Sequence, residues 1–229
     1  MTSRMWVKAG AGSLLMAAVL ALADLALTVR VTGDDLRVDQ RLSLLRFDVA
    51  TRASLDLALA AQEAVGLAAL ALAIIVLVLR HRQWDAVRLS VMAGAAWTVA
   101  LVVKYFVNRP RPPAQLWVQP PDPTGSFPSG HTTTAIVVFL IVCVLAWRFH
   151  RLRWVAIVLG SAYVLAVGIS RLYLGDHYPT DILGSFLVVA ASVLLVSALT
   201  DVPRIRQLGA RLLRLPEPTG SPAAARPGP

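Results

Sequence analysis

The sequence has 229 residues, of which 57% are hydrophobic and only 15% are charged, whereas about a quarter of the residues in soluble domains are charged. This composition excludes an ordinary soluble domain and indicates an integral membrane protein. The net charge of +9 does not indicate a nucleic-acid-binding protein, because the basic residues recur in short connections between apolar runs. Cys143 is the single cysteine, which excludes an intrachain disulfide.

Apolar runs that are long enough to cross a bilayer, which takes about 20 residues, recur along the chain. The six candidates are residues 9–30, 62–80, 88–107, 131–149, 154–170 and 182–200. They predict an all-α polytopic membrane protein with six transmembrane helices in a bundle, as one domain over residues 1–201. The first run also resembles a cleavable signal peptide ending near Ala23, but it continues through Val29, which favours a retained span.

The basic residues predict the orientation of these spans, because short cytoplasmic loops carry an excess of Lys and Arg. If the N-terminus is inside, the inner segments hold 13 basic residues and the outer segments hold 9. Trp84, Trp147 and Trp154 then fall at the inner ends of spans, where an interfacial aromatic belt is expected. We therefore expect both termini in the cytoplasm.

Two segments outside the apolar runs are polar. Residues 31–61 mix polar and apolar side chains, and Asp48, Arg52 and Asp56 recur at helical spacing, which predicts an amphipathic helix on the outer surface. Residues 202–229 begin with a basic stretch and continue into Pro, Gly, Ala and Ser. We expect a basic interfacial segment followed by a disordered cytoplasmic tail.

The four histidines fall into two groups. His81 and His150 lie among arginines in the predicted inner loops, where a solvated, charge-balancing role is expected. His131 and His177 lie at predicted outer ends of spans, each within a dense polar stretch. The fold can therefore bring these two histidines together.

Two polar stretches on the predicted outer surface suit an anion. In KYFVNRPRP, Lys104 and Arg111 are seven residues apart, and the prolines take the arginine out of the helix. In FPSGHTTTA, Ser129 can cap the fourth span, and Gly130 allows backbone N–H groups to approach a ligand closely. Such a helix N-terminus binds anions.

A third stretch, SRLYLGDHYPTD, brings a further cation and a histidine to the same surface. Arg171 leaves the fifth span, and His177 precedes Pro179, which suits a first helical turn. Asp181 follows four residues after His177, close enough to orient its imidazole. A histidine held by a carboxylate is arranged as an activated nucleophile.

Together the three stretches favour phosphoryl transfer. Each cation alone would be read as an interfacial anchor, but three cations beside a backbone anion site and two histidines match the needs of a phosphate. No carboxylate cluster with the spacing of metal ligands accompanies the histidines. We therefore expect no metal and no cofactor.

The same stretches match, in order, three motifs of a known family. These are Lys, six residues and Arg-Pro at 104–112, PSGH at 128–131, and Ser-Arg, five residues, His, three residues and Asp at 170–181. The sequence thus resembles the type 2 phosphatidic acid phosphatase superfamily, which also includes vanadium haloperoxidases. The resemblance implies six spans with outward-facing motifs. It also implies that His177 attacks phosphorus to form a phosphohistidine, that Asp181 orients it, that His131 protonates the leaving oxygen, and that the phosphate is bound by Lys104, Arg111, Ser129, Gly130 and Arg171.

This resemblance predicts a membrane lipid phosphate phosphatase whose active site faces the outside of a bacterial plasma membrane. The expected substrate is a phosphate or diphosphate monoester of a lipid, such as undecaprenyl diphosphate or phosphatidate. One alternative is a vanadate-dependent haloperoxidase, although those of the superfamily are soluble. Another is a transporter or anion-binding protein, because Asp24, Glu63 and Lys104 lie in or beside spans. Neither the lipid nor the oligomeric state follows from the sequence.

Overall fold

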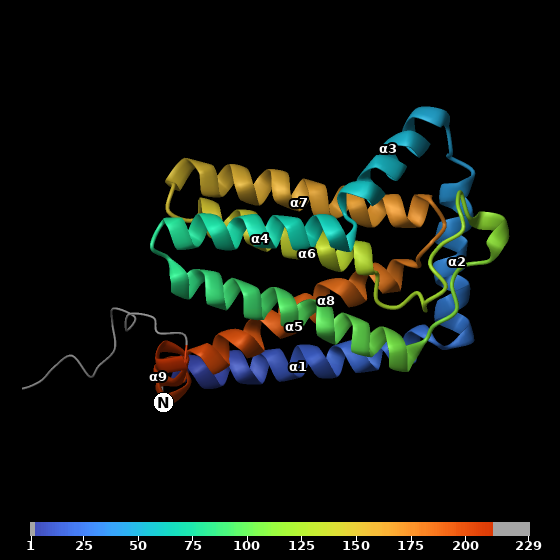
Figure 1. Cartoon of the computed structure of the whole chain (residues 1–229). Coiled ribbons are helices and arrows are strands. Elements are labelled where there is room, and N and C mark those ends of the chain that lie inside the picture. The colour runs from blue at the N-terminus through green and yellow to red at the C-terminus, as the bar shows by residue number, and fades with distance from the viewer. Residues whose placement is uncertain (1–2, 213–229) are drawn as a thin grey trace, which may run out of the picture.

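The computed structural model describes residues 3–212, which form α-helices and one short 3-10 helix (Figure 1). The predicted all-α fold is confirmed over this part of the chain. In chain order the elements are α1 (Ser3–Ala26), α2 (Val29–Ser43), α3 (Asp48–Ala60), α4 (Glu63–Leu79), α5 (Gln83–Val107), η1 (Ala114–Leu116), α6 (Gly130–Ala146), α7 (His150–Tyr173), α8 (Pro179–Thr200) and α9 (Pro203–Leu212).

The helices α1 and α4 to α8 lie side by side as an elongated bundle, and they correspond to the apolar runs of the sequence (Figure 1). Four of them, α1, α5, α7 and α8, are long and apolar enough to cross a membrane. A fifth span results if α3 and α4, which meet at a 50° bend, are counted together, whereas α6 is apolar but only 17 residues long. By length and composition, residues 3–212 thus hold four or five spans of an integral membrane protein, and the expected six spans stay a prediction.

The polar segment 31–61 holds two helices, α2 and α3, rather than the one amphipathic helix expected. The first apolar helix ends at Ala26, and the Thr28 side chain accepts a hydrogen bond from a backbone N–H to cap α2. The chain turns again before α3, so that α2 runs crosswise over one end of the bundle while α3 projects beside it (Figure 1). The polar face predicted from Asp48 and Arg52 is present on α3, where both residues are exposed.

Close approach of helices holds the bundle together. A Cβ at Gly12 would come within 2.8 Å of the Leu195 side chain, and one at Gly160 within 2.3 Å of the Phe139 ring. These glycines bring α1 against α8 and α6 against α7. Small residues at helix contacts are the usual means of packing in membranes, because apolar surface alone gives no preference for helix over lipid.

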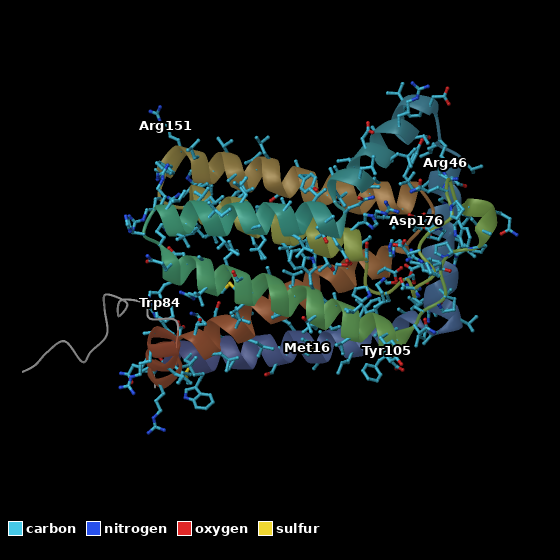
Figure 2. All side chains as sticks on the ribbon, in the orientation of Figure 1. Met16, Arg46, Trp84, Tyr105, Arg151 and Asp176 are labelled. Atoms are coloured by element: carbon cyan, nitrogen blue, oxygen red, sulfur yellow. The ribbon has the colours of Figure 1, made fainter. Side chains whose placement is uncertain are left out.

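The two ends of the bundle differ in composition. The start of α1 and the short helix α9 lie together at one end, where Lys8 forms an ion pair with Asp201 at 2.5 Å, and α2 covers the other end (Figure 1). Figure 2 shows Arg151 projecting from the α9 end, and Arg46 and Asp176 near the α2 end. The basic segment predicted after residue 202 forms α9, and the tail expected to be disordered lies largely outside the described residues.

Candidate active site

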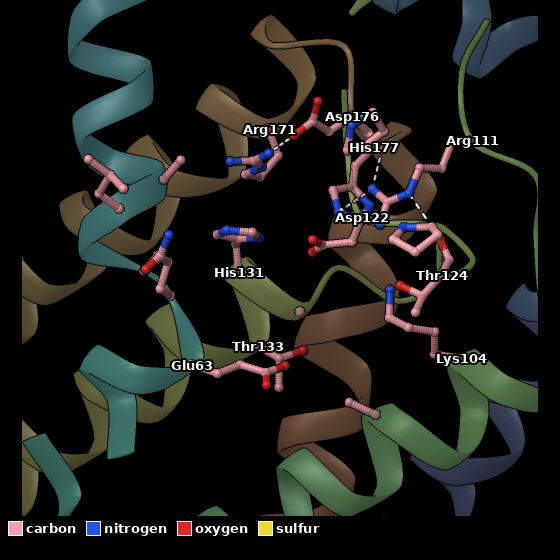
Figure 3. Close-up of a pocket in the computed structure, with 18 of the residues that line it drawn as sticks. Glu63, Lys104, Arg111, Asp122, Thr124, His131, Thr133, Arg171, Asp176 and His177 are labelled. Carbon is pink, nitrogen blue, oxygen red and sulfur yellow. Dashed lines mark hydrogen bonds and ion pairs between the residues drawn. The ribbon is translucent and has the colours of Figure 1, made fainter. Parts of the chain in front are cut away.

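A cavity of about 910 Å³ opens at the α2 end of the bundle (Figure 3). Its lining draws together the three polar stretches of the sequence, which come from the ends of α5, α6 and α7 and the loops that follow or precede them. The predicted site residues that line the cavity are Lys104, Arg111, Gly130, His131, Arg171 and His177. The other two, Ser129 and Asp181, do not line the cavity and are fully buried.

His177 lies between a carboxylate and the cations. Its Nδ1 is 3.4 Å from Asp181 Oδ2, while its Nε2 is 3.4 Å from Arg111 Nη1 on the cavity side. Asp181 is itself fixed, because the backbone N–H of Tyr178 donates to Oδ2 at 2.9 Å at the start of α8. Burial lowers the pKa of His177 to about 3, with Arg111 and Lys104 acting in the same direction and Asp181 opposing them. The imidazole is therefore neutral near pH 7.

Lys104 and Arg111 are held by backbone carbonyls of the loops before α6 and α8. Arg111 Nε donates to Thr124 O and Nη1 donates to Asp176 O, both at 3.0 Å. Lys104 Nζ donates to Gly125 O at 2.7 Å. Since these acceptors are neutral, the positive charges of Lys104 and Arg111 remain available to an anion in the cavity.

Arg171 supplies further hydrogen-bond donors. It forms an ion pair with Asp176, and both residues are buried. Among the residues that the structure describes, no partner hydrogen-bonds to Arg171 Nε or Nη1. Buried donors of this kind are normally paired, so they suit a polyanion bound in the cavity, which Arg171 lines.

The turn between Arg171 and His177 requires a glycine. Gly175 has a φ of +80°, and a Cβ there would lie 2.0 Å from Leu116 O. This close approach brings the end of η1 against the turn that presents His177.

The N-terminus of α6 faces the cavity through Gly130 and His131. The Ser129 hydroxyl caps the helix by accepting from Thr132 N at 3.3 Å. The carbonyl of Ser129 also accepts a hydrogen bond from the Ser185 hydroxyl at 2.9 Å, which ties this helix start to α8. The predicted contact of Ser129 with phosphate stays a prediction, because its hydroxyl serves as the cap.

Several residues at the site were not predicted from the sequence. Glu63, Asp122 and Thr133 also line the cavity, and the Asp122 carboxylate is directed into the space between His131 and Arg111 (Figure 3). Asp122 offsets part of the fall in the pKa of Arg111 that burial causes. The signal for Asp122 was weak, because it is a lone acidic residue in a proline-rich loop.

Known proteins are similar to the part of the chain that holds these site residues. Residues 85–204 match the family model described as the PAP2 superfamily. Phosphatidylglycerophosphatase B of Bacillus subtilis (strain 168) is 32% identical over 133 residues, which cover 56% of this chain and 64% of that protein. Undecaprenyl-diphosphatase BcrC of the same organism is 31% identical over 119 residues, covering 49% of this chain and 58% of that protein. The chain therefore spans less than two thirds of the length of these relatives.

A solved structure has the same fold over most of the chain. The crystal structure of a transmembrane PAP2-type phosphatidylglycerolphosphate phosphatase from Bacillus subtilis superimposes with a TM-score of 0.74 at 24% identity. The match covers 85% of this chain and 98% of that chain. Since the family model also spans more than half of the sequence and contains all three motifs, the chain belongs to the PAP2 superfamily.

Proposed function

We propose that this protein is a lipid phosphate phosphatase that works through a phosphohistidine on His177. The observation that carries the proposal is the setting of this imidazole. Its Nδ1 faces the Asp181 carboxylate, and its Nε2 faces a cavity lined by Lys104, Arg111 and Arg171. A neutral, oriented imidazole beside three cations is what attack on a phosphate requires.

The residues divide the reaction into two steps. In the first, the lone pair of His177 Nε2 forms a bond to phosphorus, the bond from phosphorus to the lipid oxygen breaks, and His131 donates a proton to that oxygen. In the second, the oxygen of a water molecule forms a bond to phosphorus, His131 takes a proton from that water, the bond from phosphorus to Nε2 breaks, and inorganic phosphate leaves. The cations and the N-terminus of α6 stabilise the charge on the phosphoryl oxygens in both steps.

The walls of the cavity support a substrate with a lipid tail. Leu55 and Leu59 of α3 and Leu101 of α5 line it beyond the charged groups. Leu59 is 58% exposed and Leu101 is 65% exposed, so the cavity reaches the outer side of the bundle that faces lipid in a membrane. The names of the relatives favour a phospholipid monophosphate or a polyprenyl diphosphate as the substrate class.

The proposed site faces the outside of a bacterial plasma membrane, and both termini face the cytoplasm. Residue 3 and α9 lie at the end of the bundle opposite the cavity (Figure 1). That end also carries the basic residues of the α4–α5 and α6–α7 turns, namely Arg80, Arg82, Arg148 and Arg151. By the positive-inside rule, this distribution of basic residues supports a cavity that faces outside.

The charges that suggested a transporter do not outline a separate pathway. Asp24 is exposed near the end of α1 and does not line the cavity. Glu63 and Lys104 line the same cavity as the two histidines.

Phosphate release by the purified protein in a chelating buffer tests the proposed function. The substrates are undecaprenyl diphosphate, phosphatidate, phosphatidylglycerophosphate and a soluble aryl phosphate. We expect turnover of at least one lipid, its loss in His177→Gln, and its retention in His81→Gln, which alters a histidine at the opposite end. Activity that appears only with added magnesium, or no turnover of any substrate, contradicts the proposal.

A further inference from the structure

Arg109 is a buried cation that does not belong to the phosphate-binding set. It is 1% exposed and does not line the cavity, although it lies only two residues before Arg111. Its guanidinium is on the far side of Asp181 from His177, and Nη1 donates to Asp181 Oδ1 at 2.7 Å. The two carboxylate oxygens of Asp181 are therefore held by different groups, since His177 and the Tyr178 N–H take Oδ2.

A second carboxylate holds the other side of this guanidinium. Arg109 Nη2 donates to Asp35 Oδ2 at 2.9 Å, and Asp35 is 5% exposed on α2. The Thr180 hydroxyl accepts from Arg109 Nη1 at 2.7 Å and also bonds to Asp35. The Arg109 guanidinium lies over the Tyr178 ring, 4.1 Å from its centroid. Its position is thus fixed by two carboxylates, a hydroxyl and an aromatic face.

The net negative charge of this cluster favours the reaction. Arg109, Asp35 and Asp181 together carry one net negative charge beside a neutral His177. Attack on phosphorus leaves Nδ1 protonated and gives the ring a positive charge, which this excess negative charge stabilises. If Arg109 were absent, two buried carboxylates would face each other and favour protonation of one of them.

We propose that Arg109 and Asp35 are positioning residues, which lock the Asp181 carboxylate in the ionised state and orientation that the His177 nucleophile needs. Asp35 lies outside residues 85–204, the part that matches the family model, and belongs to the helix that crosses the end of the bundle. The outer helix α2 is then part of the catalytic apparatus rather than only a cover. This inference rests on the proposed phosphohistidine mechanism.

Variants of the full-length protein separate positioning from folding. Asp35→Asn weakens the hold on Arg109, and Arg109→Gln with Asp35→Asn removes both charges while the net negative charge of the cluster is kept. Asp34→Asn is the matched control, because Asp34 pairs with Arg37 on the same helix but both side chains are largely exposed. Arg111→Gln serves as a reference for lost phosphate binding.

We expect kcat for a lipid monophosphate to fall by about tenfold to a hundredfold in Asp35→Asn and in the double variant, with KM within about twofold of the parent. Asp34→Asn keeps the parent kcat, and Arg111→Gln raises KM. Folding is checked by size exclusion and thermal unfolding in detergent. If the folded double variant has the kcat of the parent, the ion pair is only structural and the inference is wrong.

A measurement without substrate keeps this inference distinct from the proposed function. In protein with 15N-labelled histidine, the Nδ1–H signal of His177 is assigned by its absence in His177→Gln. We expect a hydrogen-bonded Nδ1–H in the parent and in Asp34→Asn, and its loss or exchange broadening in the double variant. An unchanged signal contradicts the positioning role whether or not any lipid is hydrolysed. A parent that hydrolyses no lipid but shows the expected change contradicts the proposed function alone.

Discussion

In the proposed mechanism the two histidines in the cavity have different tasks, so their replacement should have different consequences. His177→Ala removes the covalent route for every substrate, and we expect a uniform loss on the order of a thousandfold or more. His131→Ala removes the proton donor, which costs about a hundredfold to ten-thousandfold with phosphatidate, whose leaving alkoxide is strongly basic. The loss should be small with a nitrophenyl phosphate or a diphosphate. Rates on both kinds of substrate are compared in one detergent, and equal losses in His131→Ala would mean that His131 mainly binds phosphate.

The burial of Asp39, a single residue, leads to a prediction about how the stability of the protein depends on pH. It is fully buried on α2, and within the described residues neither carboxylate oxygen has a hydrogen-bond partner. Burial, helped by the charges of Asp35 and Asp181, raises the pKa of Asp39 to about 8, with Arg109 and Arg46 opposing. The folded protein therefore keeps a proton that the unfolded chain releases near pH 4, and this costs stability as the pH rises from about 4 to 8.

Asp39→Asn should remove that pH dependence. The variant and the parent are expected to unfold at similar temperatures near pH 4, and the variant should become more stable by up to about 1.4 kcal/mol for each pH unit above this. Thermal unfolding in detergent from pH 4 to 8.5 measures the difference, and Asp34→Asn is the exposed control. A difference between Asp39→Asn and the parent that does not grow with pH would show that Asp39 is ionised in the folded protein.

These residues also show which parts of the site could be predicted from the sequence. Lys104, His131 and His177 were predicted because each stands in a short motif whose spacing is local. The pairing of Arg109 with Asp35 joins segments 74 residues apart, and no local spacing indicates it. Asp35 and Asp39 are four apart, which places them on one face of a helix, but only the packing of α2 across the bundle shows that this face is buried.

At the scale of elements, the contact between α8 and the loop before α6 positions the anion site. Gly184 packs against Phe127, which is fully buried two residues before Ser129. A Cβ at Gly184 would lie 2.5 Å from the Phe127 ring, so a larger residue has to displace the start of α6. Gly184→Ala adds a single methyl group and tests whether the position of the start of α6 depends on this contact.

We expect Gly184→Ala to lower the free energy of unfolding by about 1–3 kcal/mol, as overpacking does. Phosphate release should fall by about tenfold to a hundredfold, because the donors of the anion site move. Gly94→Ala is the matched control, since Gly94 is also helical and a Cβ there would meet no atom within 4 Å. Thermal unfolding and phosphate release are measured on both variants. Parent-like activity in Gly184→Ala would mean that the start of α6 tolerates the displacement.

The helices themselves were predictable where the apolar runs were long, and less so at their ends. The boundaries of α5 and α8 are close to those expected from residues 88–107 and 182–200. The break of segment 31–61 into α2 and α3 was not predicted, because it depends on contacts with residues far along the chain. Arg46, in that break, donates to Leu116 O at 2.6 Å. Such a contact has no signature in local sequence.

At the scale of the whole molecule, the orientation in the membrane can be tested with single cysteines. The native Cys143 is first replaced by Ser, and cysteines are then introduced at Gln115 in η1 or at Arg151 in α7, which are both exposed. We expect an impermeant thiol reagent to label Gln115→Cys in intact cells and to label Arg151→Cys only after lysis. The reverse pattern would place the cavity in the cytoplasm.

The short helix α6 has a consequence for the lipid around the protein. Its 17 residues span about 25 Å, less than the roughly 30 Å thickness of a bilayer's hydrocarbon core. Either the bilayer thins beside α6 or the helix start that carries Gly130 lies below the headgroup plane. A lipid phosphate then has to descend toward the cavity, and the descent is shorter in a thin bilayer.

We expect turnover of phosphatidate to rise a few-fold from long-chain to short-chain phosphatidylcholine vesicles, while hydrolysis of a soluble aryl phosphate stays constant. Equal dependence of both rates on acyl-chain length would mean that bilayer thickness acts on the fold and not on substrate access.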